Sequence, residues 1–240
     1  MNVAVIFAGG VGRRMNNTST PKQFLELHGK PIIIYTLEVF QNCTDVDAIC
    51  ISCLGSHMDY MAKLCRKFEI DKVRWIVSGG ATGQESIFNG LEAVHRDCPG
   101  DTVVLIHDGV RPIISKELIC ANIAAVREKG NAISCTRATE TPAEVDACGK
   151  IVAISDRKSA VIAKAPQSFY LKDIYDAHTK AREAGRNDFI DSASMMRHYG
   201  AELHMVECPW DNIKITTPSD YYIFKAITEV KENAQIFGIS

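Results

Sequence analysis

The chain has 240 residues, of which 46% are hydrophobic and 23% charged, and this composition is typical of a globular protein that buries a large core. Its formal net charge of −2 argues against bulk binding of nucleic acid, which would require a strong excess of basic residues. No apolar stretch approaches the length of a membrane span, about 18 residues, and the apolar start at 1–7 is too short for a signal peptide. We therefore expect a cytoplasmic protein without a membrane partner.

The chain begins with a short apolar run, 3–7, that predicts a buried strand. Gly9, Gly10 and Gly12 follow and end this strand in a tight loop. Glycines let backbone N–H groups approach a polyphosphate closely. Positive charge in the same region comes from Arg13, Arg14 and Lys22. The loop is therefore interpreted as a phosphate-binding loop.

This glycine loop matches neither common nucleotide-binding motif. A Walker A loop would require Lys-Ser or Lys-Thr after the glycines, and neither follows. A dinucleotide fingerprint would require a third glycine where Met15 stands, and an acidic residue about 20 residues further on at the end of a strand. Glu38 lies further on, inside a segment with helical spacing. An ordinary strand-to-helix turn is the remaining alternative, but the region is more cationic than a turn requires.

Apolar runs typical of strands alternate with segments of helical spacing along the chain. This alternation implies crossover connections and a mostly parallel sheet with helices on both faces, an α/β fold in one domain, 1–240. Strands are expected at 3–7, 48–53, 73–77, 102–106, 132–136 and 202–206, and helices at 31–41, 56–68, 84–94 and 115–129.

The nine cysteines do not predict a metal or redox site. The single Cys-x-x-Cys, formed by Cys50 and Cys53, falls inside an expected strand, where positions i and i+3 point to opposite faces. No second pair is present to complete a zinc site. The cysteines are expected to be reduced, mostly buried thiols, as in a cytoplasmic protein.

The segment 102–112 carries the second group of chemical residues. Five apolar or β-branched residues predict a central strand, and His107, Asp108 and Arg111 follow at its carboxyl end. Ligands bind at that edge of open parallel sheets. A carboxylate that faces a phosphate loop is a usual ligand of Mg²⁺ on a triphosphate, and Arg111 would reach a phosphate. A plain Asp-Gly turn is the structural alternative for Asp108.

The segment 136–155 departs from the alternation because it is polar and strand-prone. A turn at 146–149 predicts a hairpin in which 140–145 pairs with 150–155. Its alternation is too polar for both faces to lie in a core, so the hairpin would be an exposed edge unless a partner covers it. We therefore expect a β-arm at about 137–156 that joins two subunits.

A third chemical feature, 210–218, precedes the last predicted helix. Lys214 alternates with Ile213 and Ile215, so its side chain points away from theirs and could line a pocket. A solvated strand lysine is the simpler alternative for this residue taken alone.

These stretches together resemble one family, the cytidylyltransferases that make 4-diphosphocytidyl-2-C-methylerythritol and their relatives that make CDP-ribitol. The resemblance covers nearly the whole chain and rests on the order and spacing of several markers. They are Ala8-Gly-Gly-x-Gly-x-Arg-Met15, Pro21-Lys-Gln23, Gly79-Gly80 with Ser86, His107-Asp-Gly-Val-Arg-Pro112, Asp156-Arg157, Ala165-Pro-Gln167, Asp191-Ser-Ala-Ser194 and Asn212-Ile-Lys-Ile-Thr-Thr217. The resemblance implies a Rossmann-like nucleotidyltransferase fold, a homodimer, and the conversion of CTP and a polyol phosphate into a CDP-polyol and pyrophosphate.

The resemblance also implies the roles of individual residues. The triphosphate would be held by Ala8, Gly9, Gly10, Gly12, Arg14 and Lys22, and Mg²⁺ by Asp108. Cytosine and ribose would contact Gly79, Gly80 and Ser86, and Lys214 would lie near the α-phosphate, so that Arg14, Lys22 and Lys214 are the catalytic residues. The polyol phosphate would be bound by Arg111, by Arg157 and by either Thr139 or Thr141. Arg157 and the threonine would be supplied by the arm of the neighbouring subunit.

Four departures from the family pattern concern the substrates. Gly83 replaces an arginine near the nucleotide, and Ala165 replaces a threonine on the polyol side. Val110 and Phe24 are closer to the ribitol branch, whereas the Asp191-Ser-Ala-Ser194 stretch is closer to the methylerythritol branch. The acceptor is therefore expected to be methylerythritol phosphate or, almost equally, ribitol 5-phosphate. The alternatives are a nucleotidyltransferase that uses another base and sugar phosphate, and a nucleotide-binding domain without catalysis.

Overall fold

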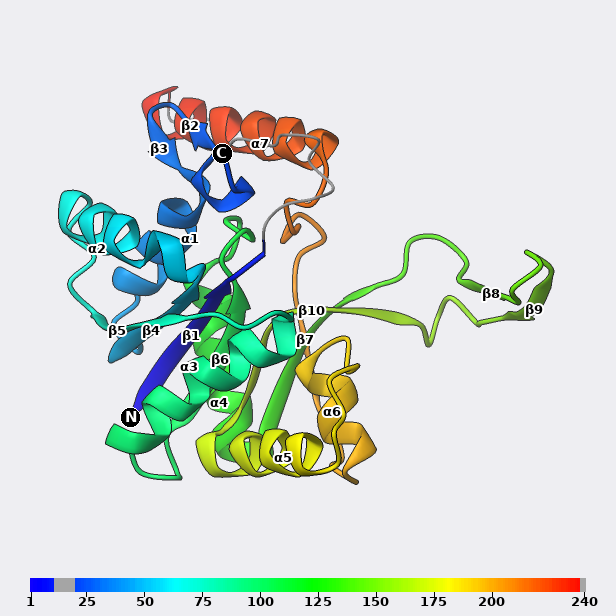
Figure 1. Ribbon diagram of the computed structural model, residues 1–240. Coiled ribbons are helices and arrows are strands. Elements are labelled where there is room, and N and C mark those ends of the chain that lie inside the picture. Colours follow the sequence, from blue (N-terminus) through cyan, green and yellow to red (C-terminus); the bar gives the residue numbers. More distant parts are fainter. Residues whose placement is uncertain (11–19, 238–240) are drawn as a thin grey trace.

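The computed structural model describes residues 1–10 and 20–237. At its centre lies a seven-stranded sheet in the order β11-β7-β10-β6-β1-β4-β5 (Figure 1). Neighbouring strands are parallel except for β10, which runs antiparallel to both β6 and β7. The strands are β1 (Asn2–Ala8), β4 (Ala48–Cys53), β5 (Val73–Ser78), β6 (Val103–Asp108), β7 (Asn131–Arg137), β10 (Val161–Tyr170) and β11 (Met205–Glu207), and β2 (Glu26–Leu27) pairs with β3 (Lys30–Pro31) beside the sheet. The predicted mostly parallel α/β sheet is confirmed.

Helices cover both faces of this sheet, as the alternation of apolar residues predicts (Figure 1). One face packs against the first, second and fourth helices, and the other against the third, fifth and sixth. The helices are α1 (Ile32–Gln41), α2 (Met58–Lys67), α3 (Gly83–Asp97), α4 (Lys116–Lys129), α5 (Leu171–Glu183), α6 (Ser192–His198) and α7 (Pro218–Phe237), with short 3₁₀ turns at Lys22–Phe24 and Gly55–His57.

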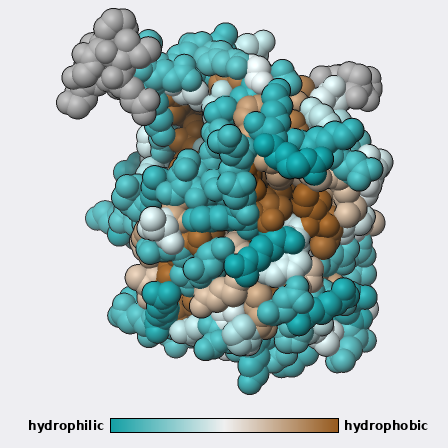
Figure 2. Space-filling view, turned by 90° about the vertical axis from the view of Figure 1, so that its left-hand side faces the viewer, coloured by the Kyte–Doolittle hydropathy of each residue, from teal (hydrophilic) through white to brown (hydrophobic). Residues whose placement is uncertain are grey.

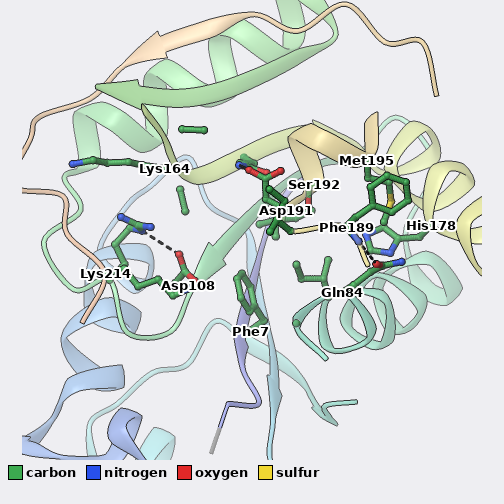
Figure 3. Close-up of a pocket in the computed structure, with 18 residues that line it drawn as sticks. Phe7, Gln84, Asp108, Lys164, His178, Phe189, Asp191, Ser192, Met195 and Lys214 are labelled. Atoms are coloured by element: carbon green, nitrogen blue, oxygen red, sulfur yellow. Dashed lines mark hydrogen bonds and ion pairs between the residues drawn. The ribbon is translucent and has the colours of Figure 1, made fainter. Parts of the chain in front are cut away.

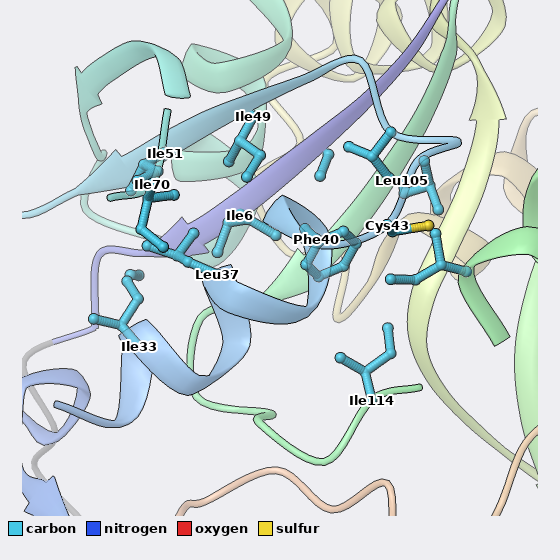
Figure 4. Close-up of a cluster of buried hydrophobic side chains, with 14 of the residues drawn as sticks. Ile6, Ile33, Leu37, Phe40, Cys43, Ile49, Ile51, Ile70, Leu105 and Ile114 are labelled. Carbon is cyan, nitrogen blue, oxygen red and sulfur yellow. The ribbon is translucent and has the colours of Figure 1, made fainter. Parts of the chain in front are cut away.

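The two cores follow from the two-residue period of the strands. Ile6 of β1 and Ile49 of β4 point to the first face, where Leu37 and Phe40 of α1 cover them (Figure 4). Val5, one position earlier, points to the opposite face and the second core. Figure 2 shows the side of the molecule that lies at left in Figure 1. The surface there is largely hydrophilic, with apolar residues visible between polar ones.

The same period separates the two cysteines of the Cys-x-x-Cys pair. Cys53 belongs to the first core and Cys50 to the second, as predicted. Burial raises the pKa of Cys50 to about 12 and that of Cys53 to about 11, so both are neutral thiols that pack as small apolar residues.

Helix ends are fixed by local sequence signals. The hydroxyl of Ser115 accepts a hydrogen bond from the N–H of Leu118 at the start of α4, and Thr82 caps α3 in the same way through the N–H of Glu85. Gly130 ends α4 in the left-handed conformation, with φ of +87°. These signals place both predicted helices within a few residues of their observed bounds.

The predicted strand at 202–206 begins later than expected. The side chain of Asn131 donates to the carbonyl of Glu202 at 2.7 Å and accepts from the N–H of His204 at 2.9 Å. The side chain of Asn131 therefore takes up the carbonyl of Glu202 and the N–H of His204, which a strand would use for pairing. Regular pairing with β7 begins only at Met205.

The predicted hairpin is confirmed and extends well away from the sheet (Figure 1). In it β8 (Ala143–Val145) pairs with β9 (Ile151–Ile154), and the turn between them places Gly149 at φ of +81°. Its larger apolar side chains are exposed, among them Val145 and Ile154 at 61% and 68%. A surface of this kind is one that a protein partner would cover.

Candidate active site

The carboxyl ends of β1 and β5 approach each other across a platform of small residues. A Cβ atom on Gly9 would lie 2.7 Å from the hydroxyl of Ser86, and one on Gly79 would lie 2.9 Å from it. The Ser86 hydroxyl accepts a hydrogen bond from the N–H of Gly80 and donates to the carbonyl of Thr82. The structure thus brings together Gly9, Gly79, Gly80 and Ser86, which the sequence assigns to nucleotide binding. A side chain at any of the three glycines would force a neighbour to move, most of all at Gly80, where a Cβ would collide with Cβ of Glu85.

Lys22 joins this region to the chain's last loop. Its Nζ donates to the carbonyl of Ile215 at 3.1 Å, next to Lys214. The neighbouring Gln23 donates to the carbonyl of Ala8, which ties the segment to the end of β1. Two predicted catalytic lysines, nearly 200 residues apart in the sequence, therefore lie on adjacent segments. Gly12 and Arg14 lie outside the described residues.

Asp108, at the end of β6, is the centre of a charged cluster. One carboxylate oxygen accepts from Nε of Arg111 at 3.1 Å, and the other lies 2.5 Å from Nζ of Lys214. Burial raises the pKa of this carboxyl, but the charges of Arg111 and Lys214 outweigh it and lower the pKa to about 2. Asp108 is therefore ionised at neutral pH, and the structure brings Asp108, Arg111 and Lys214 together.

The two cations of this cluster differ in freedom. The Arg111 side chain is buried, and it also donates to the carbonyl of Asn212 at 2.7 Å, so it fixes the loop that carries Lys214. Lys214 is more exposed, at 37% of its side chain, and lines a pocket. Lys214 is therefore the more accessible of the two cations, whereas Arg111 is held in place.

His107 is a buried residue beside this cluster. Its ring is fully buried below the cluster, where Nε2 lies 3.1 Å from the carbonyl of Arg111. Burial, followed by the charge of Arg111, lowers its pKa to about 4, so the ring is neutral at physiological pH. The residue supports the loop and does not face the reactants.

A pocket of about 220 Å³ extends from this cluster into the fold. Figure 3 shows Asp108 and Lys214 on one side and Gln84, His178 and Phe189 on the other, with Asp191 and Ser192 between them. Its walls come from β1, β6 and β10, from α3 and α5, and from the segment that leads into α6. The pocket is thus continuous from the charged cluster to an inner end under α5.

Asp191 is held rigidly over the middle of this pocket. One carboxylate oxygen accepts from the N–H of Ser194 and caps α6, and the other accepts from Nε2 of Gln167 at 2.8 Å. Oε1 of Gln167 in turn accepts from the N–H of Ala193 at 2.8 Å. The role of Gln167 was not anticipated, although it ends the Ala165-Pro-Gln167 marker.

Gln84 was also missed as a site residue. It is buried, and its amide bridges to a segment more than 100 residues away, donating to the carbonyl of Arg186 at 2.8 Å and accepting from the N–H of Phe189 at 3.2 Å. Gln84 therefore connects the helix that carries Ser86 with the segment that carries Asp191.

The remaining predicted site residues lie on the arm and are not brought to this pocket. Thr139, Thr141 and Arg157 are exposed, and Nη1 of Arg157 donates to the carbonyl of Thr139 at 3.3 Å. The arm projects away from the body of the chain (Figure 1). If these residues act in catalysis, they act in another copy.

The described residues contain no group of three or more His, Cys, Asp or Glu side chains that could hold a metal ion. Asp108 offers one ionised carboxylate at the pocket edge. Because Mg²⁺ on a nucleotide needs only one or two carboxylates besides phosphate oxygens and water, this donor fits the predicted ion.

Comparisons with known proteins agree with this geometry. The sequence model of the IspD family, described as 2-C-methyl-D-erythritol 4-phosphate cytidylyltransferase, matches residues 2–230. A ribitol-5-phosphate cytidylyltransferase of Streptococcus agalactiae serotype III is 52% identical over 239 residues, 100% of each chain. A 2-C-methyl-D-erythritol 4-phosphate cytidylyltransferase of Clostridium botulinum is 35% identical over 95% of this chain and 97% of its own. The solved 4-diphosphocytidyl-2C-methyl-D-erythritol synthase of Anaerococcus prevotii superposes with a TM-score of 0.81, at 26% identity, over 95% of this chain and 96% of its own.

Proposed function

The chain belongs to the IspD family of cytidylyltransferases, and from this premise we propose that its acceptor is ribitol 5-phosphate. The chain is a CTP-dependent nucleotidyltransferase that transfers CMP to a polyol phosphate. The observation that carries the choice of acceptor is the full-length 52% identity to a relative named for ribitol 5-phosphate, against 35% to one named for methylerythritol phosphate. The expectation from the sequence places methylerythritol phosphate first and ribitol 5-phosphate almost level, and the proposal reverses that order.

We assign CTP to the platform at the ends of β1 and β5. Gly79, Gly80 and Ser86 would contact cytosine and ribose, since glycines let the backbone approach a ligand closely. Gly9, which packs against Ser86, would begin the loop that holds the triphosphate. The triphosphate would then run along the loop after β1, toward Gly10, Gly12, Arg14 and Lys22. Its α-phosphate would lie near Lys214.

The acceptor's phosphate oxygen attacks the α-phosphorus of CTP in line, and the P–O bond to pyrophosphate breaks. A phosphate monoester has its second pKa at about 6, so the nucleophile is already ionised at neutral pH and needs no general base. This agrees with the neutral, buried His107. Catalysis then consists of positioning and of neutralising charge on the α-phosphate and the leaving pyrophosphate.

Lys214 provides the mobile part of this neutralisation. In the described structure its ammonium is paired with Asp108, and its partial exposure allows it to turn toward a phosphate. Arg111 remains on Asp108 and keeps the carboxylate in place. Asp108 would hold Mg²⁺ together with phosphate oxygens, and the ion would supply further neutralisation of the triphosphate.

The active protein is proposed to be a homodimer joined through the arm. Support comes from the four larger apolar residues exposed on it, Val145, Ile151, Val152 and Ile154. Arg157 and either Thr139 or Thr141 would bind the acceptor phosphate at the partner's pocket. Free cysteines at all nine positions fit a protein that works in the reducing cytoplasm. No helix among the described residues has the length and apolarity needed to span a membrane.

Subunit mixing tests the shared site. Arg157→Ala and Lys214→Ala are each expected to inactivate the enzyme, but a mixed dimer of the two would keep one intact site. After unfolding and refolding of an equimolar mixture, about a quarter of the wild-type activity should return, because half of the dimers are mixed and each has one working site. If Arg157 served its own chain, the mixture would remain inactive.

The acceptor is tested by pyrophosphate release from CTP and Mg²⁺ with ribitol 5-phosphate and methylerythritol 4-phosphate in parallel. We expect the higher kcat/KM with ribitol 5-phosphate. A higher value with methylerythritol 4-phosphate would overturn the proposed acceptor while leaving cytidylyl transfer intact. UTP, GTP and ATP serve as controls for the base.

A further inference from the structure

The inner end of the pocket contains polar groups that the transfer of CMP does not use. Figure 3 shows Gln84, His178, Phe189 and Met195 gathered on the side away from Asp108 and Lys214. These residues line the same cavity as the charged cluster. A polyol phosphate whose phosphate lies at the cluster therefore has room to extend its carbon chain inward.

Two side chains that line the pocket from its middle to this end are buried without hydrogen-bond partners among the described residues. They are Ser192, whose hydroxyl oxygen has none, and His178, where both ring nitrogens have none. The exposed fractions of the two residues are only 3% and 1%. An unpaired buried polar group typically costs on the order of 1–3 kcal/mol, and most such groups in folded proteins are paired. Two of them lining one cavity indicate a ligand or water that completes them.

The protonation state of His178 narrows the chemistry of that ligand. Burial, followed by the charge of Arg182, lowers the pKa of His178 to about 4, so the ring is neutral at physiological pH. A neutral imidazole offers one N–H donor and one nitrogen acceptor, and a serine hydroxyl also does both. An alcohol group matches these donors and acceptors, because its hydroxyl can both donate and accept a hydrogen bond. An ionised phosphate can only accept, and an ammonium can only donate.

The surroundings suit the carbon skeleton of a polyol. Ile87, Ile106, Phe189 and Met195 contribute apolar surface to the same cavity. Asp191, fixed by Gln167 and by the N–H of Ser194, stands between this end and the cluster, where it can accept from a hydroxyl in the middle of the chain. From the cluster inward, the pocket thus presents first charged groups, then the carboxylate of Asp191, and then neutral hydrogen-bond donors and acceptors.

We propose that this inner end is a hydroxyl subsite, in which His178 and Ser192 bind the terminal C1 hydroxyl of an extended linear polyol phosphate and so select an acceptor with an unbranched five-carbon chain. The proposal rests on the proposed function, since it places the far end of the same acceptor. Of the two residues to which it assigns specificity, His178 lies outside the family markers, whereas Ser192 falls within the Asp191-Ser-Ala-Ser194 stretch.

The test removes the hydroxyl from the protein and from the acceptor in turn. Pyrophosphate release is measured with ribitol 5-phosphate and with 1-deoxyribitol 5-phosphate, for the wild type, Ser192→Ala and His178→Phe. Thr179→Val is the matched control, because its hydroxyl is on the same helix as His178 but donates to the carbonyl of Tyr175.

The wild type is expected to prefer ribitol 5-phosphate by at least about tenfold in kcat/KM. Ser192→Ala should lose about tenfold with ribitol 5-phosphate but less than about twofold with the deoxy analogue, with an unchanged KM for CTP. Without substrate its thermal midpoint should be unchanged or higher, because the hydroxyl has no partner to lose. If the analogue turns over too slowly, the same ratio is read from the thermal shift that each acceptor produces.

Equal use of both acceptors by the wild type would overturn the subsite, as would an equal loss on both acceptors in Ser192→Ala. Ser192→Ala makes the test independent of whether His178→Phe folds. Failure of the proposed function gives a different result, namely no turnover of ribitol 5-phosphate by the wild type.

Discussion

Replacement of Gln84 tests whether the nucleotide and acceptor sides of the site are mechanically connected. Its buried amide makes two hydrogen bonds to the segment that leads to Asp191, at 2.8 and 3.2 Å. Each bond contributes about 1 kcal/mol net, so Gln84→Ala should lower the free energy of unfolding by about 1–2 kcal/mol. Arg186 and Phe189 then lose these two bonds, so the segment that leads to Asp191 is less firmly held, although Asp191 keeps its own bonds to Gln167 and Ser194.

The kinetic consequence should fall mainly on the acceptor. We expect the KM for ribitol 5-phosphate to rise about tenfold, with the KM for CTP within about twofold of wild type. Gln84→Glu is a sharper variant of equal size: it keeps an acceptor for the Phe189 N–H but sets a carboxylate oxygen against the Arg186 carbonyl. Asn89→Ala is the control, since Asn89 is on the same helix but bonds to Ser78, outside the pocket.

Steady-state kinetics and urea unfolding, measured on the same preparations, separate the outcomes. A loss of stability with an unchanged KM for the acceptor would refute the positioning role and leave Gln84 as a structural residue. An equal rise in both KM values would also refute it, because the perturbation would then act on α3 as a whole.

Substitutions at three further positions test the charged cluster and the buried histidine. Lys214→Ala should lower kcat by about 10²–10³, as for the loss of other single electrostatic donors, and Lys214→Arg should restore part of it; an effect on KM alone would contradict the role of Lys214 in the transition state. Asp108→Asn should raise the Mg²⁺ concentration needed for half-maximal rate, and an unchanged Mg²⁺ dependence would remove Asp108 from the metal site. His178 binds a proton in the unfolded chain below about pH 6.5 but in the folded chain only below about pH 4, so it makes stability fall as the pH falls through this window. His178→Phe should therefore lose less stability than wild type between pH 6.5 and 4, by on the order of 3 kcal/mol at the lower limit, as measured by urea unfolding at each pH.

Local sequence patterns predicted the parts of the fold that depend on local physics. The apolar run at 48–53 predicts a strand, the alternation of side chains along a strand predicts the separate burial of Cys50 and Cys53, and the turn at 146–149 predicts the hairpin. Such patterns do not specify which strands become neighbours. The insertion of β10 between β6 and β7 and its antiparallel direction were not predicted for that reason.

The candidate site shows the same division. The motifs identified Asp108 at the end of β6, Ser86 in the first turn of α3 and Lys214 in the loop before α7, because each falls within a short pattern that resembles the family. Gln84 and His178 were not identified, since an amide or an imidazole inside a helical pattern is indistinguishable from a surface residue until its distant partners are known. The predictions for Gly12 and Arg14 fall outside the described residues, and the assignment of Mg²⁺ and of the arm residues stays a prediction.

The most direct test of the central claim is to identify the product. CTP, Mg²⁺ and ribitol 5-phosphate are incubated with the protein and followed by ³¹P NMR. The account predicts a new diphosphate diester, CDP-ribitol, that forms in equal amount to pyrophosphate as the signals of CTP and of the acceptor phosphate disappear. Hydrolysis of CTP without a new diester, or a diester that forms only with a different acceptor, would contradict it.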